Sequence, residues 1–472
     1  MKGSHQHNFF GDNQFDDLLA RYERMIGQGE HYYFDVEDLE QIIEHYLDLS
    51  KTGKALNAVR YAFRLHPNAF PLMIKKAQVH LRNKNPQRAL KALREVKDFE
   101  SSNNEYYLTM GHAYLLMNNL EEAEECYYKA LYLVDDTDEQ LDMLQNISQT
   151  LQFSEMHDLA IKYLRKAHQL EPQNLMILYD LAFCYEKEGK LQKSIDYYSK
   201  YLNIEPYTEH IWYSLGKIHS EAGQLDKARE AYEMAIAINP EYGDALFELA
   251  ILQEDDGQYE QAIEAYTDYL RQEPESADVH YFVGNCYFQV NKDEQALEHF
   301  QKALKLESHN PGVYYGIAKI LFNRNNLWDA LFYAKRATML DDQDHELFIL
   351  YGRINSRLRM YKESAKAFLK AVELKPEILK YWIMFTDELI RNQKFEQALK
   401  YTLQSLELHD NNPRIYFRIA ALYYKTDRLR YSIRYFRKGM MMNSEQYDEF
   451  FNICPEAKRS REIKKLLKNQ II

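Results

Sequence analysis

Glycine and proline are scarce in this chain of 472 residues, with 16 and 11 copies respectively. Because these residues supply many of the tight turns that connect strands, their scarcity disfavours a β-rich fold and favours long helices with short connections. Hydrophobic residues make up 46% of the sequence and charged residues 28%, a balance typical of a folded globular protein. The length suffices for several domains or for one long array of repeats.

Cysteine is also rare, and its four copies lie far apart. Cys126, Cys184, Cys286 and Cys454 form no CxxC pair, and consecutive cysteines are separated by at least 58 positions. A zinc site or a disulfide framework needs closer or paired spacing. We therefore predict reduced thiols that pack as small apolar residues, no metal site and no cofactor.

Long hydrophobic runs are absent as well. The first fifteen residues contain no apolar segment of the kind found in secretory signals, and no run approaches the roughly 18 apolar residues that a membrane helix requires. The sequence therefore predicts a cytoplasmic protein that does not insert into membranes. Residues 1–11 are predicted to form a disordered leader, and His5 and His7 within it are weak grounds for a metal site.

What the sequence does contain is a repeat of 34 residues, seen most clearly from Trp212 to Pro240. The segment WYSLGKIHSEAGQLDKAREAYEMAIAINP reads as two amphipathic helices separated by a glycine and closed by a proline. Twelve copies fit end to end if three residues, 138–140, are treated as an insertion. The copies begin at Val36, Phe70, Asn104, Leu141, Leu175, Glu209, Gly243, Ala277, Pro311, His345, Leu379 and Pro413.

Small residues occupy two columns of this repeat. Position 20 is always Ala or Ser, and position 8 is Gly, Ala, Ser or Thr in every copy except the first, which has Ile43. Two helices that cross closely need residues without bulk at the crossing, because overpacking such a point costs about 1–3 kcal/mol. The two columns therefore predict a close contact between the helices of each copy.

Two further columns mark the ends of helices. The position between the two helices holds glycine or asparagine in six copies: Gly189, Gly223, Gly257, Asn118, Asn291 and Asn325. These residues tolerate the left-handed conformation that ends a helix. Position 32 holds proline, which stops the second helix, or Ser and Asp, which cap the start of the next.

This pattern resembles the tetratricopeptide repeat, whose columns are matched here by Trp212, Leu215, Gly216, Ala228, Tyr232, Ala235 and Pro240. Only His219 departs from the expected tyrosine. The resemblance covers about 411 residues, and the chain looks like the long all-repeat proteins of Bacteroidetes bacteria. It implies an all-α, right-handed solenoid of about twelve helix–turn–helix repeats, with the first helices lining a concave face.

The ends of such an array need caps, because a terminal repeat would otherwise expose its apolar stacking face. We predict an N-terminal capping helix and linker over residues 12–35, and a C-terminal capping helix over residues 447–472. Repeats 1–3 then occupy residues 36–137, and repeats 4–12 occupy residues 141–446. Self-association through an end remains open.

Catalytic motifs are missing from the sequence. We find no Gly-rich phosphate loop, no HExxH, no GxSxG and no EF-hand run. The histidines scatter without ligand spacing, and His112, His219 and His280 fall on repeat helices, where packing is the expected role. About 35 residues precede the repeats and 26 follow them, too few for a catalytic domain of about 50 residues or more. We predict no catalytic residues and no enzyme activity.

The family geometry places position 5 of each repeat toward the groove. Five successive repeats carry an aromatic residue there: Tyr179, Tyr213, Phe247, Tyr281 and Tyr315. Rings offer a large contact area with few rotamers to freeze, which suits binding of a peptide or helix. The alternative is that these rings pack between neighbouring first helices and expose only an edge.

Charge divides unevenly along the chain. Residues 311–472 hold 29 Lys and Arg against 19 Asp and Glu, a net charge of +10, whereas the whole chain carries −13. Residues 1–310 therefore carry −23. Several C-terminal basic residues fall in or beside groove columns, and we predict that they bind a partner: Lys319, Arg353, Arg357, Arg391, Arg414, Arg418 and Lys425.

The leading interpretation is a non-enzymatic scaffold that binds protein or peptide segments, including acidic ones, in the groove of the solenoid. The alternative is a polyanion or RNA binder that uses the basic C-terminal third. A net charge of −13 and an isoelectric point near 5.7 disfavour nonspecific affinity for nucleic acid.

Overall fold

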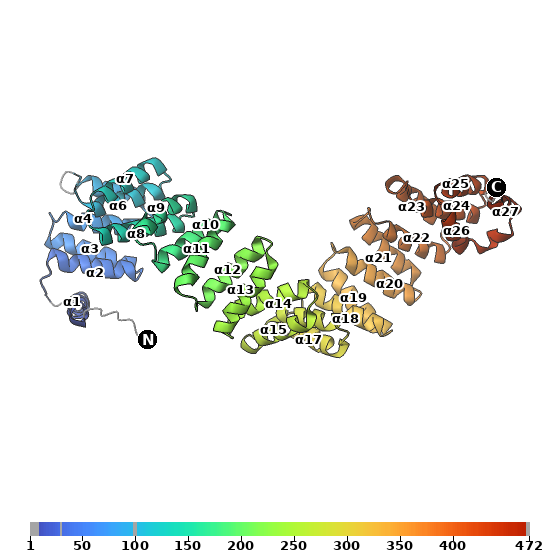
Figure 1. Cartoon of the computed structure of the whole chain (residues 1–472), viewed down its shortest axis with the longest axis horizontal. Coiled ribbons are helices and arrows are strands. Elements are labelled where there is room, and N and C mark those ends of the chain that lie inside the picture. The colour runs from blue at the N-terminus through green and yellow to red at the C-terminus, as the bar shows by residue number, and fades with distance from the viewer. Residues whose placement is uncertain (1–8, 29–30, 98–101, 469–472) are drawn as a thin grey trace. The chain divides into compact units, whose positions relative to one another are not determined.

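The computed structural model describes residues 9–28, 31–97 and 102–468. These residues form 27 α-helices and two short 3-10 helices, and no strand occurs among them (Figure 1). The prediction of an all-α array of about twelve helix pairs with helical ends is confirmed, because α2 to α25 follow one another along the chain as twelve pairs. None of the helices formed by the described residues is long and apolar enough to cross a lipid bilayer.

The chain divides into two compact units, Met1–Ala228 and Arg229–Ile472. The helices of the first unit are α1 (Phe9–Gln28), α2 (Val36–Asp48), α3 (Thr52–Leu65), α4 (Pro71–Arg82), α5 (Pro86–Arg94), α6 (Asn104–Leu116), α7 (Leu120–Tyr132), α8 (Thr137–Phe153), α9 (His157–Leu170), α10 (Leu175–Lys187), α11 (Leu191–Ile204) and α12 (Glu209–Glu221). The division falls within α13 (Leu225–Ile238).

The second unit continues the pattern. Its helices are α14 (Gly243–Asp255), α15 (Tyr259–Gln272), α16 (Ala277–Gln289), α17 (Asp293–Leu306), α18 (Pro311–Asn323), α19 (Leu327–Leu340), α20 (His345–Arg357), α21 (Tyr361–Leu374), α22 (Leu379–Arg391), α23 (Phe395–Leu408), α24 (Pro413–Lys425), α25 (Leu429–Met442), η1 (Ser444–Tyr447), α26 (Asp448–Ile453), η2 (Pro455–Arg459) and α27 (Arg461–Lys468). Within this unit each first helix packs on its own second helix, and α18 also contacts the first helices on either side, α16 and α20.

The ends of the array differ in detail from the sequence prediction. Helix α1 begins at Phe9, inside the range predicted as a leader, and residues 1–8 of that range lie outside the described residues. At the other end, residues 444–468 form four short helices instead of one. Pro455 lacks the backbone N–H that would continue α26, which explains the break. The insertion at residues 138–140 lies in the first turn of α8, which is 17 residues long.

The small residues of positions 8 and 20 lie where the paired helices cross, and both columns are buried. Where position 20 is serine, its hydroxyl can donate to the carbonyl of position 8 across the crossing. The Ser194 hydroxyl donates to the carbonyl of Ala182 at 2.7 Å, and that of Ser364 donates to the carbonyl of Gly352 at 2.8 Å. In these two repeats the hydroxyl therefore keeps a partner in a buried site, whereas the buried hydroxyl of Ser432 has none among the described residues.

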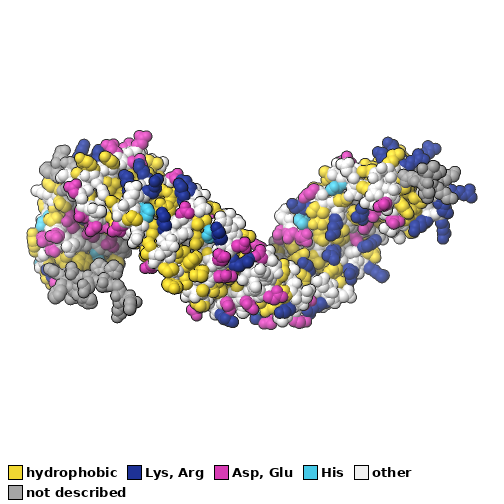
Figure 2. Space-filling model, in the orientation of Figure 1, with side chains coloured by type: hydrophobic (Ala, Val, Ile, Leu, Met, Phe, Trp, Pro, Cys, Tyr) yellow, Lys and Arg dark blue, Asp and Glu magenta, His cyan; other side chains and the backbone are white. Residues whose placement is uncertain are grey.

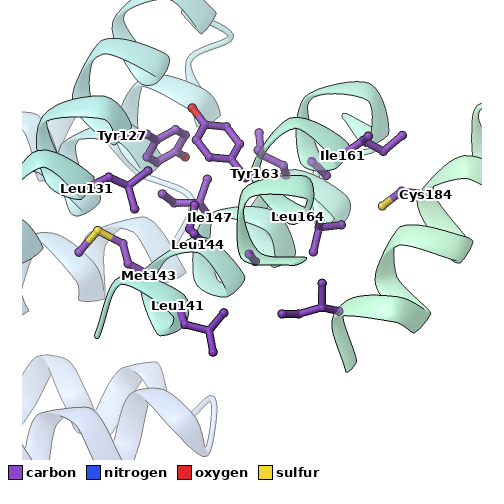
Figure 3. Close-up of a cluster of buried hydrophobic side chains, with 14 of the residues drawn as sticks. Tyr127, Leu131, Leu141, Met143, Leu144, Ile147, Ile161, Tyr163, Leu164 and Cys184 are labelled. Carbon is purple, nitrogen blue, oxygen red and sulfur yellow. The ribbon is translucent and has the colours of Figure 1, made fainter. Parts of the chain in front are cut away.

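Aromatic rings fill the space beside these crossings. In the cluster of Figure 3, Tyr127 of α7 and Tyr163 of α9 meet edge to face, with ring centroids 5.9 Å apart, above the aliphatic side chains of α8. A Cβ added to Gly111 would lie 2.5 Å from the Tyr127 ring. The glycine at position 8 is therefore required by the ring that covers it.

The turn inside every pair uses one left-handed residue. All twelve copies have a positive φ at the predicted position, including six residues that are neither glycine nor asparagine: Ser50, Lys84, Glu155, Arg359, Gln393 and Asp427. The repeat geometry thus imposes this conformation even on side chains that disfavour it.

A pair of substitutions tests this turn. Gln393, with φ 59°, is expected to gain about 0.5–1 kcal/mol of stability when replaced by glycine, because the side chain no longer opposes the left-handed conformation. Gly223, with φ 71°, has no atom within 4 Å of an added Cβ, so Gly223→Ala is expected to lose about 1 kcal/mol through the backbone alone. Thermal unfolding followed by circular dichroism measures both. A lower melting temperature for Gln393→Gly would contradict the prediction.

Candidate functional site

The five aromatic residues at position 5 lie on five first helices. Tyr179 and Tyr213 belong to the first unit, and Phe247, Tyr281 and Tyr315 belong to the second. All five side chains are half-buried. Part of each residue is therefore accessible, and their place in a binding groove stays a prediction.

Contacts of these rings reach across to the neighbouring first helix. The ring of Phe247 lies 6.0 Å from that of Phe282 on α16 and 5.8 Å from that of Tyr269 on α15. The ring of Tyr281 covers Gly312 of α18, where an added Cβ would lie 2.7 Å from the Tyr281 hydroxyl. Both contacts are of the kind expected for rings that pack between helices and leave an edge free.

Three of the predicted basic residues line one pocket in the second unit. Arg353 and Arg357 of α20 and Arg391 of α22 surround a hollow of about 490 Å³, which we call the arginine pocket. Phe322 of α18 forms one wall, and the guanidinium groups of Arg353 and Arg357 lie 5.1 and 5.4 Å from the centre of its ring. A single buried ring therefore positions two cationic side chains.

The arginines of this pocket differ in their partners. Arg391 donates to the hydroxyl of Ser356 at 2.8 Å and to the carboxylate of Glu388 at 2.6 Å. Glu388 is only 2% exposed, and burial raises the pKa of its carboxyl above the usual range. Arg353 and Arg357 are both exposed, and within the described part of the chain neither forms an ion pair with a carboxylate. Two cations of the pocket are therefore open to an anion from outside.

Lys319 lies on α18, the helix that carries Phe322. Its ammonium group is 4.9 Å from the centre of the Phe288 ring and 5.7 Å from that of Tyr315. Burial raises the pKa of Tyr315 to about 12, so this tyrosine is neutral and donates or accepts as a hydroxyl at physiological pH. Lys319 thus contacts Tyr315, one of the five aromatic residues at position 5.

The three remaining predicted residues contact the C-terminal segment instead. Arg418 is 3% exposed; it donates to the hydroxyl of Thr386 at 2.9 Å, to the carboxylate of Asp387, and to that of Glu449 at 2.6 Å. Arg414 donates to the second oxygen of Glu449 at 3.1 Å. The distance between the Lys425 ammonium and the Glu456 carboxylate is 2.5 Å. These cations tie α24 to the segment that follows α25.

A matching arrangement near the other end was missed by sequence reasoning. Lys75 of α4 is 5% exposed and donates to the carboxylates of Glu44, on α2, and Glu105, at 2.7 Å on α6. Lys75 and Arg418 occupy position 6 of their repeats, and Glu44 and Asp387 occupy position 9 of the preceding ones. The detectable signal was a basic residue at position 6 that follows an acidic residue at position 9.

His280 and the four cysteines lie in buried, packed positions. His280 is 7% exposed, its Nε2 lies 3.2 Å from the carbonyl of Pro274, and its Nδ1 lies 3.1 Å from Nδ1 of His299. All four cysteines are buried and unbridged, and burial raises the pKa of Cys126 to about 11. Among the described residues, no group of three or more His, Cys, Asp or Glu side chains could hold a metal ion.

The histidine pair predicts acid sensitivity. Burial, helped by His280 and Lys302 and opposed by Glu298, lowers the pKa of His299 from 6.5 to about 4. The folded state therefore disfavours protonation of His299, whereas the unfolded chain takes up a proton near pH 6.5. The free energy of unfolding is therefore highest above pH 6.5 and falls as the pH drops toward 4. We expect a loss of about 1–2 kcal/mol between pH 7 and pH 5. Thermal unfolding across this range should show a shallower pH dependence in His299→Gln, and equal slopes would refute the prediction.

A family model described as "Tetratricopeptide repeat" matches residues 62–337, and a second model of the same description matches residues 345–378. No curated protein matches the chain.

Three solved structures are similar to parts of this chain. YrrB, described as a TPR protein with an unusual peptide-binding site, is 20% identical over 42% of this chain and 99% of its own, with a TM-score of 0.37. PilF of Pseudomonas aeruginosa is 22% identical over 44% of this chain and 94% of its own, with a TM-score of 0.38. A tetratricopeptide repeat protein from Parabacteroides merdae is 18% identical over 53% of this chain and 98% of its own, also with a TM-score of 0.38.

Proposed function

Because this chain belongs to the tetratricopeptide repeat family, we propose that it is a non-enzymatic scaffold that binds an acidic segment of a partner protein at the arginine pocket. Repeats of this family are protein-interaction modules, which gives the general function. The observation that carries the finer proposal is the pair of exposed guanidinium groups of Arg353 and Arg357, which both lie over the Phe322 ring. Asp387 and Glu388 also line the pocket, but they pair with Arg418 and Arg391, and within the described residues neither Arg353 nor Arg357 forms an ion pair.

The chemistry of the pocket favours carboxylates. A guanidinium group presents a planar fork of N–H donors that fits a carboxylate with two hydrogen bonds. Stacking on Phe322 holds each fork in place, so fewer side-chain rotamers are lost when a ligand binds. An Asp- or Glu-rich segment that lies along the first helices could also contact Tyr315 and Lys319.

The alternative, a nucleic-acid binder that uses the basic C-terminal third, gains less support. Figure 2 shows many Lys and Arg side chains over the C-terminal helices. Arg414 and Arg418 share Glu449, Lys425 pairs with Glu456, and Arg428 pairs with Glu396 at 2.9 Å. These internal carboxylates already neutralise cations that would otherwise face phosphates. The cytoplasmic location and self-association stay predictions.

The test is crosslinked capture of partners from the native extract, followed by mass spectrometry. The Arg353→Glu/Arg357→Glu variant should lose the partner by at least tenfold. Arg391 is left unchanged because its guanidinium neutralises the buried Glu388. The matched control is Lys362→Glu/Lys366→Glu, which makes the same charge change with two exposed residues of α21 that do not line the pocket.

Specificity is then tested with a synthetic peptide. A peptide copied from the acidic stretch of the captured partner should displace it, and the same peptide with Gln in place of Glu should not. Higher salt should weaken the interaction, because exposed charges are screened. Circular dichroism verifies that both variants fold. Equal capture by wild type and by both variants would refute the arginine pocket as the binding site.

A further inference from the structure

A second basic surface, absent from the sequence predictions, lies on the first unit. Two adjoining hollows of about 500 and 390 Å³ lie between α9 and α11, and Arg165, Tyr185 and Lys193 line both of them. Lys166 extends the first hollow and Lys200 the second. A group of dark-blue side chains is visible over this region in Figure 2. We refer to the two hollows together as the lysine groove.

Most cations of the lysine groove have no internal counter-ion. Lys162 pairs with Glu124 at 2.8 Å, and Lys190 pairs with Asp158 at 2.5 Å. The other four cationic side chains are exposed and pair with no carboxylate in the described ranges; they are Arg165, Lys166, Lys193 and Lys200. The first unit as a whole is acidic, with 25 Lys and Arg against 35 Asp and Glu in residues 1–228. Six cations and only two carboxylates, Asp158 and Asp196, line the groove, so it is a local exception that an anion would recognise.

Tyrosine rings hold the lysines in place. The ammonium group of Lys200 lies 4.4 Å from the centre of the Tyr197 ring, and that of Lys193 lies 5.3 Å from the centre of the Tyr185 ring. The two rings stack on each other with centroids 5.6 Å apart and an angle of 15° between their planes. This stacked pair fixes the spacing of two ammonium groups, and it leaves little ring face on which a nucleic-acid base could stack.

We propose that the lysine groove binds a compact anion with two or three linked phosphate groups, either free or as the phosphate chain of a nucleotide. Ammonium groups act as point charges that suit phosphate oxygens from several directions, whereas the forked arginines of the arginine pocket suit carboxylates. A compact ligand places its charge among the four unpaired cations. An extended polyanion would reach beyond the groove over a unit whose net charge is negative, where like charges repel it.

Calorimetric titration of the full chain tests this site with inorganic tripolyphosphate and with ATP. The Lys166→Gln/Lys193→Gln/Lys200→Gln variant should bind both at least tenfold more weakly than wild type. Lys91→Gln/Lys97→Gln/Lys227→Gln is the matched control, because it removes three exposed lysines of the same unit that lie outside the groove. Equal affinity for the two probes shows that phosphates alone are recognised, and tighter binding of ATP shows that the nucleoside adds contacts. Both results support the proposal.

Three results would overturn it. Tripolyphosphate and ATP that fail to bind wild type, or that bind the groove variant as tightly, would exclude the site. A twelve-residue oligothymidylate or a polyglutamate peptide that binds the groove more tightly than tripolyphosphate would assign it to an extended polyanion. Circular dichroism checks the fold of each variant, and the exposure of the three lysines makes a folding defect unexpected.

Discussion

Replacement of Arg418 by methionine is expected to destabilise the C-terminal end of the array by about 3–5 kcal/mol. Arg418 is 3% exposed and is the shared partner of Asp387 and Glu449. Methionine fills a similar volume but leaves two carboxylates without their common cation, one of them largely buried. Because each part of a repeat array contacts only its neighbours, the loss should stay local.

Hydrogen exchange measured by mass spectrometry locates this effect. Amides of α24 and of residues 444–463 should lose protection in Arg418→Met, while those of α2 to α12 should keep theirs. Arg414→Met is the matched control, because its side chain is 48% exposed and such pairs contribute about 0–1 kcal/mol. The triple variant Arg418→Met/Asp387→Met/Glu449→Met should recover most of the stability, since no unpaired buried charge remains. Equal protection in Arg418→Met and wild type would contradict the buried ion triad.

Replacement of Phe300 by alanine is expected to cost about 3–5 kcal/mol in the second unit. The ring is fully buried between two glycines, and a Cβ added to Gly284 or to Gly316 would lie 2.6 Å from it. Gly284 belongs to the same repeat and Gly316 to the next. One ring therefore fills both the crossing inside a pair and the contact between pairs, and its removal opens a cavity at both.

A double-mutant cycle measures the fit of ring and glycine. Gly284→Ala alone should cost about 1–3 kcal/mol, because the added methyl group collides with a ring that cannot move. Phe300→Leu shortens the side chain, so Gly284→Ala should cost less in that background. Chemical unfolding of the four proteins gives the coupling energy. Strictly additive effects would show that Gly284 is not needed to accommodate the Phe300 ring.

Much of the fold was predictable because it is local and repeated. The twelve copies, their small columns and the left-handed turn follow from helical periodicity and from residues that tolerate one backbone conformation. Because the pattern occurs twelve times, the turn remains recognisable even though copies such as those with Glu155 and Gln393 have neither glycine nor asparagine there. The ends were less predictable. The break at Pro455 and the start of α1 at Phe9 lie outside the repeated columns, so no other copy of the repeat predicts them.

The candidate sites were predictable only in part. Position within the repeat placed Arg353, Arg357 and Arg391 on one face, and these three residues line one pocket. The same rule selected Arg418, whose guanidinium is buried in an internal ion triad. The position of a residue within the repeat predicts the direction of its side chain. It does not predict whether a carboxylate from another repeat forms an ion pair with that side chain.

The sequence by itself determined the architecture of this protein, because each helix pair is specified by columns of residues at fixed spacing. Only the tertiary structure decided which cations are available to a partner. Lys75 and Arg418 are neutralised by residues about 30 positions away in the chain, whereas Arg353 and Lys193 are not. The reason is physical: the pairing of a charge depends on distances of a few ångströms between repeats, and a one-dimensional pattern does not contain those distances.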